Sequence, residues 1–276
     1  MMYATVMVGL SVDQPNEVRL EIAGQLAERL GARVIGITAA EFSPPLYFTD
    51  GEQAQKLVEQ GRATIKNRIA EVEGDFRAAM HNRVSDVEWR CAEDFPSRFI
   101  VQQARACDII VTGEAGRGDL GDPFVQISAS DLVMQAGRPL LVVPEACDWL
   151  DLRSVLVAWK DTAEARRAVA DALPLLRTAA EATVVEIVEE QADRAVALAR
   201  VGDVVAWLSR HGISASGLVP HECSEAGVQL ERIASEVGAG VVVAGAYGHS
   251  RLREWILGGV TERLINPRNH CSLLSR

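Results

Sequence analysis

The stretch GVVVAGAYGHSRLREWILGGVT, residues 240–261, carries the strongest structural signal in the chain. Three valines form an apolar run that ends at Gly245, which is the pattern of a buried strand entering a turn. More glycines follow at Gly248 and at the pair Gly258–Gly259. Glycine lets the backbone approach a ligand closely, and unpaired N–H groups at a helix start favour an anion. The stretch therefore predicts a phosphate site, although glycines also occur at strand-to-helix turns that bind no ligand.

Strands and helices are expected to alternate before this stretch as well. Short apolar runs predict strands, and apolar residues that recur every three or four positions predict helices. In the first half, helices are expected near 16–30, 53–80, 99–106 and 127–136. The strands expected between them are Val6–Leu10, Arg33–Ala39, Val87–Cys91, Asp108–Thr112 and Pro139–Val143.

The second half repeats this order. Helices are expected over Thr162–Leu176, near 191–211 and 228–237, and from the glycine loop to about Leu264. The expected strands are SVLVAWKD at 154–161, Ala182–Val188, Ile213–Val219, Val241–Ala244 and a short Leu273–Leu274. Alternation of helices with nearly all-apolar strands predicts parallel sheets with helices on both faces.

The two halves can be aligned with each other. Val6–Ser11 aligns with Val155–Lys160, and GEAG at 113–116 aligns with GAYG at 245–248. A repeat with the period of a whole domain indicates duplication. Residues 145–152, EACDWLDL, interrupt the pattern as a linker, so we expect two domains, 1–146 and 151–276.

Composition narrows the classes of function. The 276 residues suit two domains, and 48% hydrophobic content is enough for two packed cores. A net charge of −10 argues against general nucleic-acid binding. No apolar run reaches the roughly 18–20 residues of a membrane span, and the first residues lack a signal-peptide pattern, so a cytoplasmic protein is expected. The five scattered cysteines fit reduced thiols better than disulfides or structural zinc.

Gly245, Gly248 and Gly258 have the spacing G-x2-G-x9-G within a duplicated strand–helix order. In these residues the chain resembles the universal stress protein (UspA-like) family in its tandem two-domain form. The resemblance implies an α/β fold of two doubly wound domains, each a five-stranded parallel sheet with helices on both faces. This fold is Rossmann-like and similar to that of the adenine nucleotide alpha hydrolases. The implied function is a stress-response or regulatory module that binds ATP or ADP, with or without Mg²⁺.

The resemblance also implies which residues of the second half hold the nucleotide. Val188 would contact adenine through its backbone, and Ala158 would line the ribose. The hydroxyl of Thr261 and the charge of Arg251 would contact phosphates. Main-chain contacts to the ribose and phosphates would come from Gly245, Gly248, Gly258, Gly259 and Val260.

Three positions of the second half need separate interpretation. Lys160 stands where relatives that bind ATP usually have an aspartate near the ribose; a lysine there either meets a phosphate or points to solvent. Gly259 replaces a usual Ser or Thr, which removes one hydroxyl contact worth on the order of 1 kcal/mol. His249 lies inside the glycine loop, where it either hydrogen-bonds a phosphate or the ribose or faces solvent.

The first half departs further from the family pattern. It keeps the glycine pair of GEAG, but Gln126 stands where the third glycine belongs, and Ser11 replaces the aspartate. Asp119 and Asp122 lie in the same loop, where carboxylates would repel a phosphate. The first half is therefore predicted to have a degenerate nucleotide site.

Other patterns give little support to catalysis. His221, Glu222 and Cys223 form the one close cluster with metal-ligand side chains, and a polar loop explains them better. Trp159 and Trp255 flank the predicted site and fit core positions. No GxSxG elbow, Walker phosphate loop or catalytic carboxylate pair is recognisable.

Three functions remain open at this level. One is the nucleotide-binding module; the second is a slow ATPase or another hydrolase. The third is a ligand-free interaction protein whose halves form a pseudo-dimer. Domains of the family commonly pair through their fifth strands, so Leu140–Val143 could pair with Leu273–Leu274 within one chain. A further homodimer is compatible with this arrangement.

Overall fold

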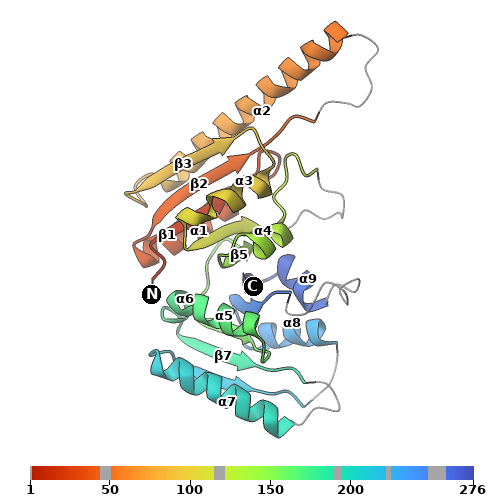
Figure 1. Ribbon diagram of the computed structural model, residues 1–276. Coiled ribbons are helices and arrows are strands. Elements are labelled where there is room, and N and C mark those ends of the chain that lie inside the picture. Colours follow the sequence, from red (N-terminus) through yellow and green to blue (C-terminus); the bar gives the residue numbers. More distant parts are fainter. Residues whose placement is uncertain (1, 44–50, 115–121, 189–193, 222–224, 248–258) are drawn as a thin grey trace.

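The computed structural model describes residues 2–43, 51–114, 122–188, 194–221, 225–247 and 259–276. Within these residues, the strands form one sheet in the order β3-β2-β1-β4-β5-β10-β9-β6-β7-β8. Figure 1 shows the two halves arranged one above the other along this sheet. In each half the strands have the doubly wound order 3-2-1-4-5 when they are read from the outer edge of the sheet toward its middle.

The first half contains five parallel strands joined by helices. The strands are β1 (Thr5–Gly9), β2 (Arg33–Ala39), β3 (Val87–Ala92), β4 (Ile109–Gly113) and β5 (Leu140–Val143). The helices are α1 (Glu17–Leu30), α2 (Gly51–Met80), α3 (Pro96–Gln103) with the 3-10 turn η1 (Ala104–Ala106), and α4 (Ala129–Gln135).

The second half has the same arrangement. Its strands are β6 (Ser154–Ala158), β7 (Glu181–Val185), β8 (Ala215–Leu218), β9 (Val241–Gly245) and β10 (Cys271–Ser275). Its helices are α5 (Ala163–Asp171), α6 (Leu173–Leu176), α7 (Arg194–Arg210), α8 (Ala226–Glu236) and α9 (Gly259–Ile265). The predicted α/β fold class with two doubly wound, five-stranded halves is confirmed.

Helices cover both faces of the sheet because the strands are apolar on both sides. In β1, Val6 and Val8 point to the face covered by α1, α2, α5, α6 and α7, and Met7 points to the opposite face. The opposite face is covered by α3, α4, α8 and α9. Side chains of this kind contribute about 1.5–3 kcal/mol each when fully buried. The strands therefore gain stability from both layers.

Helix α2 extends well past the edge of the sheet (Figure 1). Its buried side chains are Ile65, Val72, Phe76 and Met80, which lie between the middle of the helix and its C-terminal end. The ring of Phe76 packs on that of Trp89, with 5.5 Å between ring centroids. The packing of α2 is thus concentrated in its C-terminal turns.

The two halves meet at β5 and β10, which pair in antiparallel orientation. Leu141 lies opposite Leu273, and Leu140 lies opposite Leu274. The pairing joins what would otherwise be two exposed sheet edges, and exposed edges favour aggregation. The result is one sheet with a shared core on each face.

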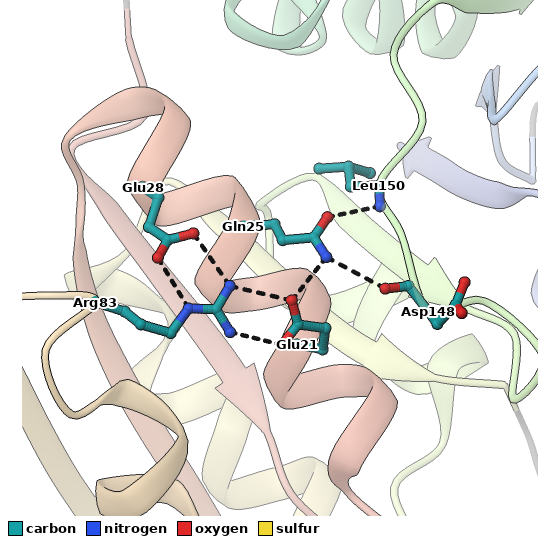
Figure 2. A network of polar contacts seen from close by, with 6 residues as sticks. All are labelled: Glu21, Gln25, Glu28, Arg83, Asp148 and Leu150. Carbon is teal, nitrogen blue, oxygen red and sulfur yellow. Dashed lines mark hydrogen bonds and ion pairs between the residues drawn. The ribbon is translucent and has the colours of Figure 1, made fainter.

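The linker after β5 is fixed to α1 by one glutamine. The backbone N–H of Leu150 donates to Oε1 of Gln25 at 2.8 Å, and Nε2 of Gln25 donates to the carbonyl oxygen of Asp148 at 3.2 Å. Figure 2 shows how this network continues through Glu21 to the guanidinium of Arg83. The linker is therefore hydrogen-bonded to the first half.

Three predicted boundaries are wrong for identifiable reasons. The predicted helix Thr162–Leu176 is divided into α5 and α6, because Pro174 lacks an N–H and lies at the start of a new helix. Helix α3 begins at Pro96, earlier than predicted, since proline suits the first helical turn. Strand β7 ends at Val185, and the next residue, Glu186, places its carboxylate on Arg200.

Candidate functional site

The strand order of the second half contains a point where the chain changes face. Strands β6 and β9 are neighbours, with Ala158 paired to Ala244 at their carboxyl ends. The chain leaves β6 for α5 on one face of the sheet, and α9, which follows β9, lies on the other. Ligands of open parallel sheets bind at the carboxyl ends of strands at such a switch point. This end of the sheet is therefore the candidate site.

The end of β6 places three consecutive side chains in three environments. Ala158 is half-buried on the face of α8 and α9, whereas Trp159 packs on the opposite face. The indole nitrogen of Trp159 is buried and has no acceptor among the described residues. Lys160 is exposed; its carbonyl oxygen accepts from the N–H of Thr162 at 2.7 Å, and its ammonium has no hydrogen bond or ion pair with the described residues. Its ammonium is the cationic group at this end of β6.

Gly245 ends β9 and is in close contact with the first turn of α5. A Cβ at Gly245 would lie 2.5 Å from the backbone nitrogen of Ala165 and 2.6 Å from the carbonyl carbon of Glu164. The hydroxyl of Thr162 caps α5 by accepting from the N–H of Ala165 at 3.3 Å. Glycine at this position thus brings the backbone of a helix start against the end of β9. Helix packing explains Gly245 without any ligand.

Tyr247 begins the glycine loop in an unusual conformation. Its φ is +58°, in the left-handed region that bulky residues seldom adopt. Its ring packs against the core on the face of α8 and α9. A strained residue of this kind is commonly found at functional sites.

A carboxylate lies beside the start of α9. A Cβ at Gly259 would be 2.8 Å from Oε1 of Glu225, and the other oxygen of Glu225 accepts from Arg263 at 3.2 Å. Both side chains are partly exposed, so solvent weakens this ion pair. Val260 and Thr261 follow in α9 and are half-buried. A phosphate at Gly259 would meet a nearby negative charge.

The structure brings together only some of the predicted site residues. Ala158, Lys160 and Gly245 lie at the carboxyl ends of β6 and β9, and Val188 follows the neighbouring strand β7. Gly259, Val260 and Thr261 begin α9. The remaining predicted residues, Gly248, His249, Arg251 and Gly258, lie outside the described residues, as do Glu222, Cys223 and Trp255.

The corresponding end of the first half is filled by polar side chains. The hydroxyl of Ser11 donates to one carboxylate oxygen of Asp13, and Gln126 donates to the other at 3.4 Å. The side chain of Asn16 makes two hydrogen bonds with the backbone of Ser11, at 2.8 and 2.9 Å. Ser11 and Gln126, the two departures from the family pattern, thus meet in one network.

Arg19 fills the space above the end of β4. A Cβ at Gly113 would be 2.7 Å from Nε of Arg19, whose side chain is only 7% exposed. Its guanidinium donates to Oε1 of Gln14 at 3.2 Å and to the carbonyl oxygen of Pro15 at 3.0 Å. Burial lowers the pKa of Arg19, and the negative charge of Asp13 opposes this shift.

The sequence gives no clear signal for Arg19 or Glu225. Arg19 follows Val18 on a helix whose predicted apolar stripe excludes it, and Glu225 precedes α8 without a recognisable motif. Thr162 does carry a signal, because a threonine before a helix with Glu164 in its first turn is a typical N-cap.

Two kinds of feature are absent from the described residues. Within those ranges, no helix combines the length and apolar character needed to cross a membrane. In the same part of the chain, no three His, Cys, Asp or Glu side chains are arranged to hold a metal ion.

Comparison with known proteins identifies the family. The model of the universal stress protein family matches residues 2–144, which is more than half of the 276 residues. A universal stress protein from Archaeoglobus fulgidus DSM 4304 has a TM-score of 0.72 at 15% identity, over 98% of this chain and 96% of that one. A protein of unknown function from Pseudomonas aeruginosa PAO1 has a TM-score of 0.60 at 14% identity, over 99% and 92%. No curated protein matches significantly. From the match to residues 2–144, the chain belongs to the universal stress protein family.

Proposed function

We propose that the protein is a cytoplasmic stress-response or regulatory module that binds one adenine nucleotide, ATP or ADP, in its second half. The observation that carries this proposal is the switch point between β6 and β9, where Gly245 brings the first turn of α5 against the strand end. Backbone N–H groups of a helix start favour anions, and strand ends at a switch point favour ligands. Membership of the universal stress protein family agrees with this function.

The proposed contacts follow the order of the strands. Adenine would lie near Val188 after β7, and the ribose near Ala158 at the end of β6. The phosphates would extend toward the loop after β9, with Lys160 supplying a positive charge, and Mg²⁺ could accompany them. The other proposed contacts come from Gly245, Gly248, His249, Arg251, Gly258, Gly259, Val260 and Thr261.

We propose that residues 1–146 and 151–276 are two domains with different roles. In residues 1–146, the network of Ser11, Asp13 and Gln126 supports a degenerate site, because its own polar groups satisfy one another. The buried guanidinium of Arg19 further reduces the space above Gly113. Residues 151–276 would then bind the nucleotide alone.

Calorimetric titration of the purified protein with ATP and with ADP tests the proposal. We expect saturable binding to the wild type and about 5- to 10-fold weaker binding to Lys160→Ala, because one charge-assisted phosphate contact is lost. Lys66→Ala, an exposed lysine on α2, is the matched control and should bind as the wild type does. Absence of heat and of thermal stabilisation at millimolar nucleotide would refute the proposal, since a ligand at 100 times its Kd stabilises by about 2.7 kcal/mol.

Two observations favour a ligand-free interaction protein instead. The carboxylate of Glu225 beside Gly259 is unfavourable for a phosphate, and β5 and β10 already join the halves as a pseudo-dimer. The same titration separates the two functions, because an interaction protein would give no nucleotide heat. Phosphate release above the buffer rate would point to the remaining function, a slow ATPase.

A further inference from the structure

Two cysteines that are far apart in the sequence lie side by side at the junction of the halves. Cys147 belongs to the linker after β5, and Cys271 is the first residue of β10. Their Sγ atoms are 3.8 Å apart, within hydrogen-bond distance for sulfur. Both side chains belong to the described part of the chain and both are free thiols.

The two thiols differ in environment. Cys147 is half-buried, and its Sγ also contacts the carbonyl oxygen of Trp149 at 3.3 Å. The hydrogen bond from Cys271 lowers the pKa of Cys147 to about 7, despite partial burial. Cys271 is fully buried, and both its hydrogen bond to Cys147 and its burial raise its pKa. At neutral pH, a large fraction of Cys147 is therefore thiolate, whereas Cys271 keeps its proton and can donate it to Cys147.

We propose that Cys147 and Cys271 form a redox site, in which a hydroperoxide converts the two thiols to a reversible disulfide. The site is separate from the proposed nucleotide site: Cys271 is paired with Val241 at the amino end of β9, whereas Gly245 is at the carboxyl end. This inference does not depend on nucleotide binding.

The reaction proceeds in two balanced steps. The Cys147 thiolate attacks one oxygen of hydrogen peroxide; the O–O bond breaks, and hydroxide leaves and takes up a proton to form water. Cys147 becomes a sulfenic acid, having lost two electrons to the peroxide. The sulfur of Cys271 then loses its proton, attacks the sulfur of Cys147 and displaces hydroxide, which takes up that proton and leaves as the second water.

The local structure allows the bond to form with little movement. A disulfide needs about 2.05 Å between sulfur atoms, so the pair must approach from 3.8 Å. Cys271 is held in β10, where its N–H donates to the carbonyl oxygen of Gly240 at 2.9 Å. Cys147 lies outside any helix or strand, so it is the partner that can move. Gln25 holds the linker just beyond it and keeps the thiols together.

The other described cysteines show what distinguishes this pair. Cys91 is exposed and has no thiol neighbour among the described residues. Cys107 is buried, which raises its pKa to about 12, and its Sγ contacts the carbonyl oxygen of Ala104 at 3.4 Å. Unlike Cys91 and Cys107, Cys147 therefore combines a lowered pKa with a neighbouring thiol.

The experiment is disulfide mapping of the full chain after treatment with a few equivalents of hydrogen peroxide. Free thiols are alkylated under denaturing conditions, and peptides are analysed by mass spectrometry before and after reduction. We expect loss of two of the five thiols, a linked pair of peptides containing Cys147 and Cys271, and full recovery with dithiothreitol. Cys91→Ser should give the same linkage, and Cys147→Ser and Cys271→Ser should abolish it.

Melting temperature provides a second readout. A bond between residues that are 124 positions apart restricts the unfolded chain, so the oxidised protein should melt on the order of 5 °C higher than the reduced protein. Cys147→Ser should show no such shift. Retention of all five thiols, a linkage between other cysteines, or oxidation of Cys147 to sulfinic acid without a bond to Cys271 would overturn the proposal.

Discussion

The carboxyl ends of β4 and β9 are equivalent places in the two halves, and the chain covers them differently. Both strands end in a glycine. At Gly113 the covering group is the guanidinium of Arg19, whereas at Gly245 it is the backbone of Glu164 and Ala165 in α5. One half therefore closes its strand end with a side chain, and the other with the start of a helix.

This difference supports the proposal that the second half alone binds a nucleotide. The buried guanidinium of Arg19 already donates hydrogen bonds to Gln14 and Pro15 within the protein. A helix start has N–H groups without intrahelical partners, and these can donate hydrogen bonds to an anionic ligand. The same strand order can thus support a closed end in the first half and a binding end in the second.

The largest expected effect comes from adding a methyl group at the two glycines. Gly245→Ala forces backbone atoms of α5 to move, and should cost about 3 kcal/mol in the free energy of unfolding. In Gly113→Ala the added methyl group contacts the flexible side chain of Arg19, so the loss in the free energy of unfolding should be about 1 kcal/mol or less. Urea denaturation of both variants measures the difference. Equal costs would mean that the two strand ends are covered in the same way.

The second effect is a loss of folding stability at acidic pH. Burial lowers the pKa of His270 in the second half from 6.5 to about 4, and neither ring nitrogen has a hydrogen-bond partner among the described residues. The unfolded chain takes up a proton near pH 6.5 and the folded chain only near pH 4, so stability falls as pH falls between these values. Between pH 7 and pH 5 the loss in the free energy of unfolding should be about 2 kcal/mol.

Denaturation midpoints at pH 7 and pH 5 check this prediction. His270→Leu should reduce the pH dependence, whereas His81→Asn, at an exposed histidine of the first half, should leave it unchanged. If the free energy of unfolding of His270→Leu falls between pH 7 and pH 5 as much as that of the wild type, the loss of stability in acid comes from carboxylates and not from His270.

A double-mutant cycle measures the energetic coupling between Arg19 and Gly113. Arg19→Ala removes hydrogen bonds to Gln14 and Pro15 and should cost about 1–2 kcal/mol. It also makes room for a side chain, so Gly113→Ala should cost nearly nothing in the Arg19→Ala background. The two free energies should therefore be non-additive by about 0.5–1 kcal/mol. Additive values would show that Arg19 does not restrict Gly113.

The smallest expected effect is on nucleotide affinity. Glu225→Gln removes the negative charge beside Gly259, and should tighten ATP binding about 2- to 5-fold at low salt. Glu236→Gln, at the exposed C-terminal end of the helix α8 that Glu225 precedes, is the control and should leave the Kd unchanged. Calorimetric titration with ATP at two salt concentrations measures the Kd of each variant. Weaker binding in Glu225→Gln would mean that its ion pair with Arg263 supports the site.

Most of the fold could be predicted from local patterns. The apolar run Arg33–Ala39 has the bounds of β2, and Gly31 ends α1 in the left-handed conformation that favours glycine. Boundaries set by proline or by long-range pairing, as at Pro174 and Glu186, could not be read from periodicity.

Less of the candidate site could be predicted from the sequence. The spacing of glycines identified Gly245, but its contact with α5 depends on how a distant helix packs. Arg19 and Glu225 come close to Gly113 and Gly259 only in three dimensions, and their own neighbours in the sequence give no indication of it.

Native mass spectrometry with excess ATP tests most directly whether the two strand ends differ in function. One nucleotide per chain, lost when Lys160 and Thr261 are both replaced by alanine, is the predicted result. Two nucleotides per chain would show that the end covered by Arg19 also binds, and none would show that the helix start at Gly245 serves packing alone.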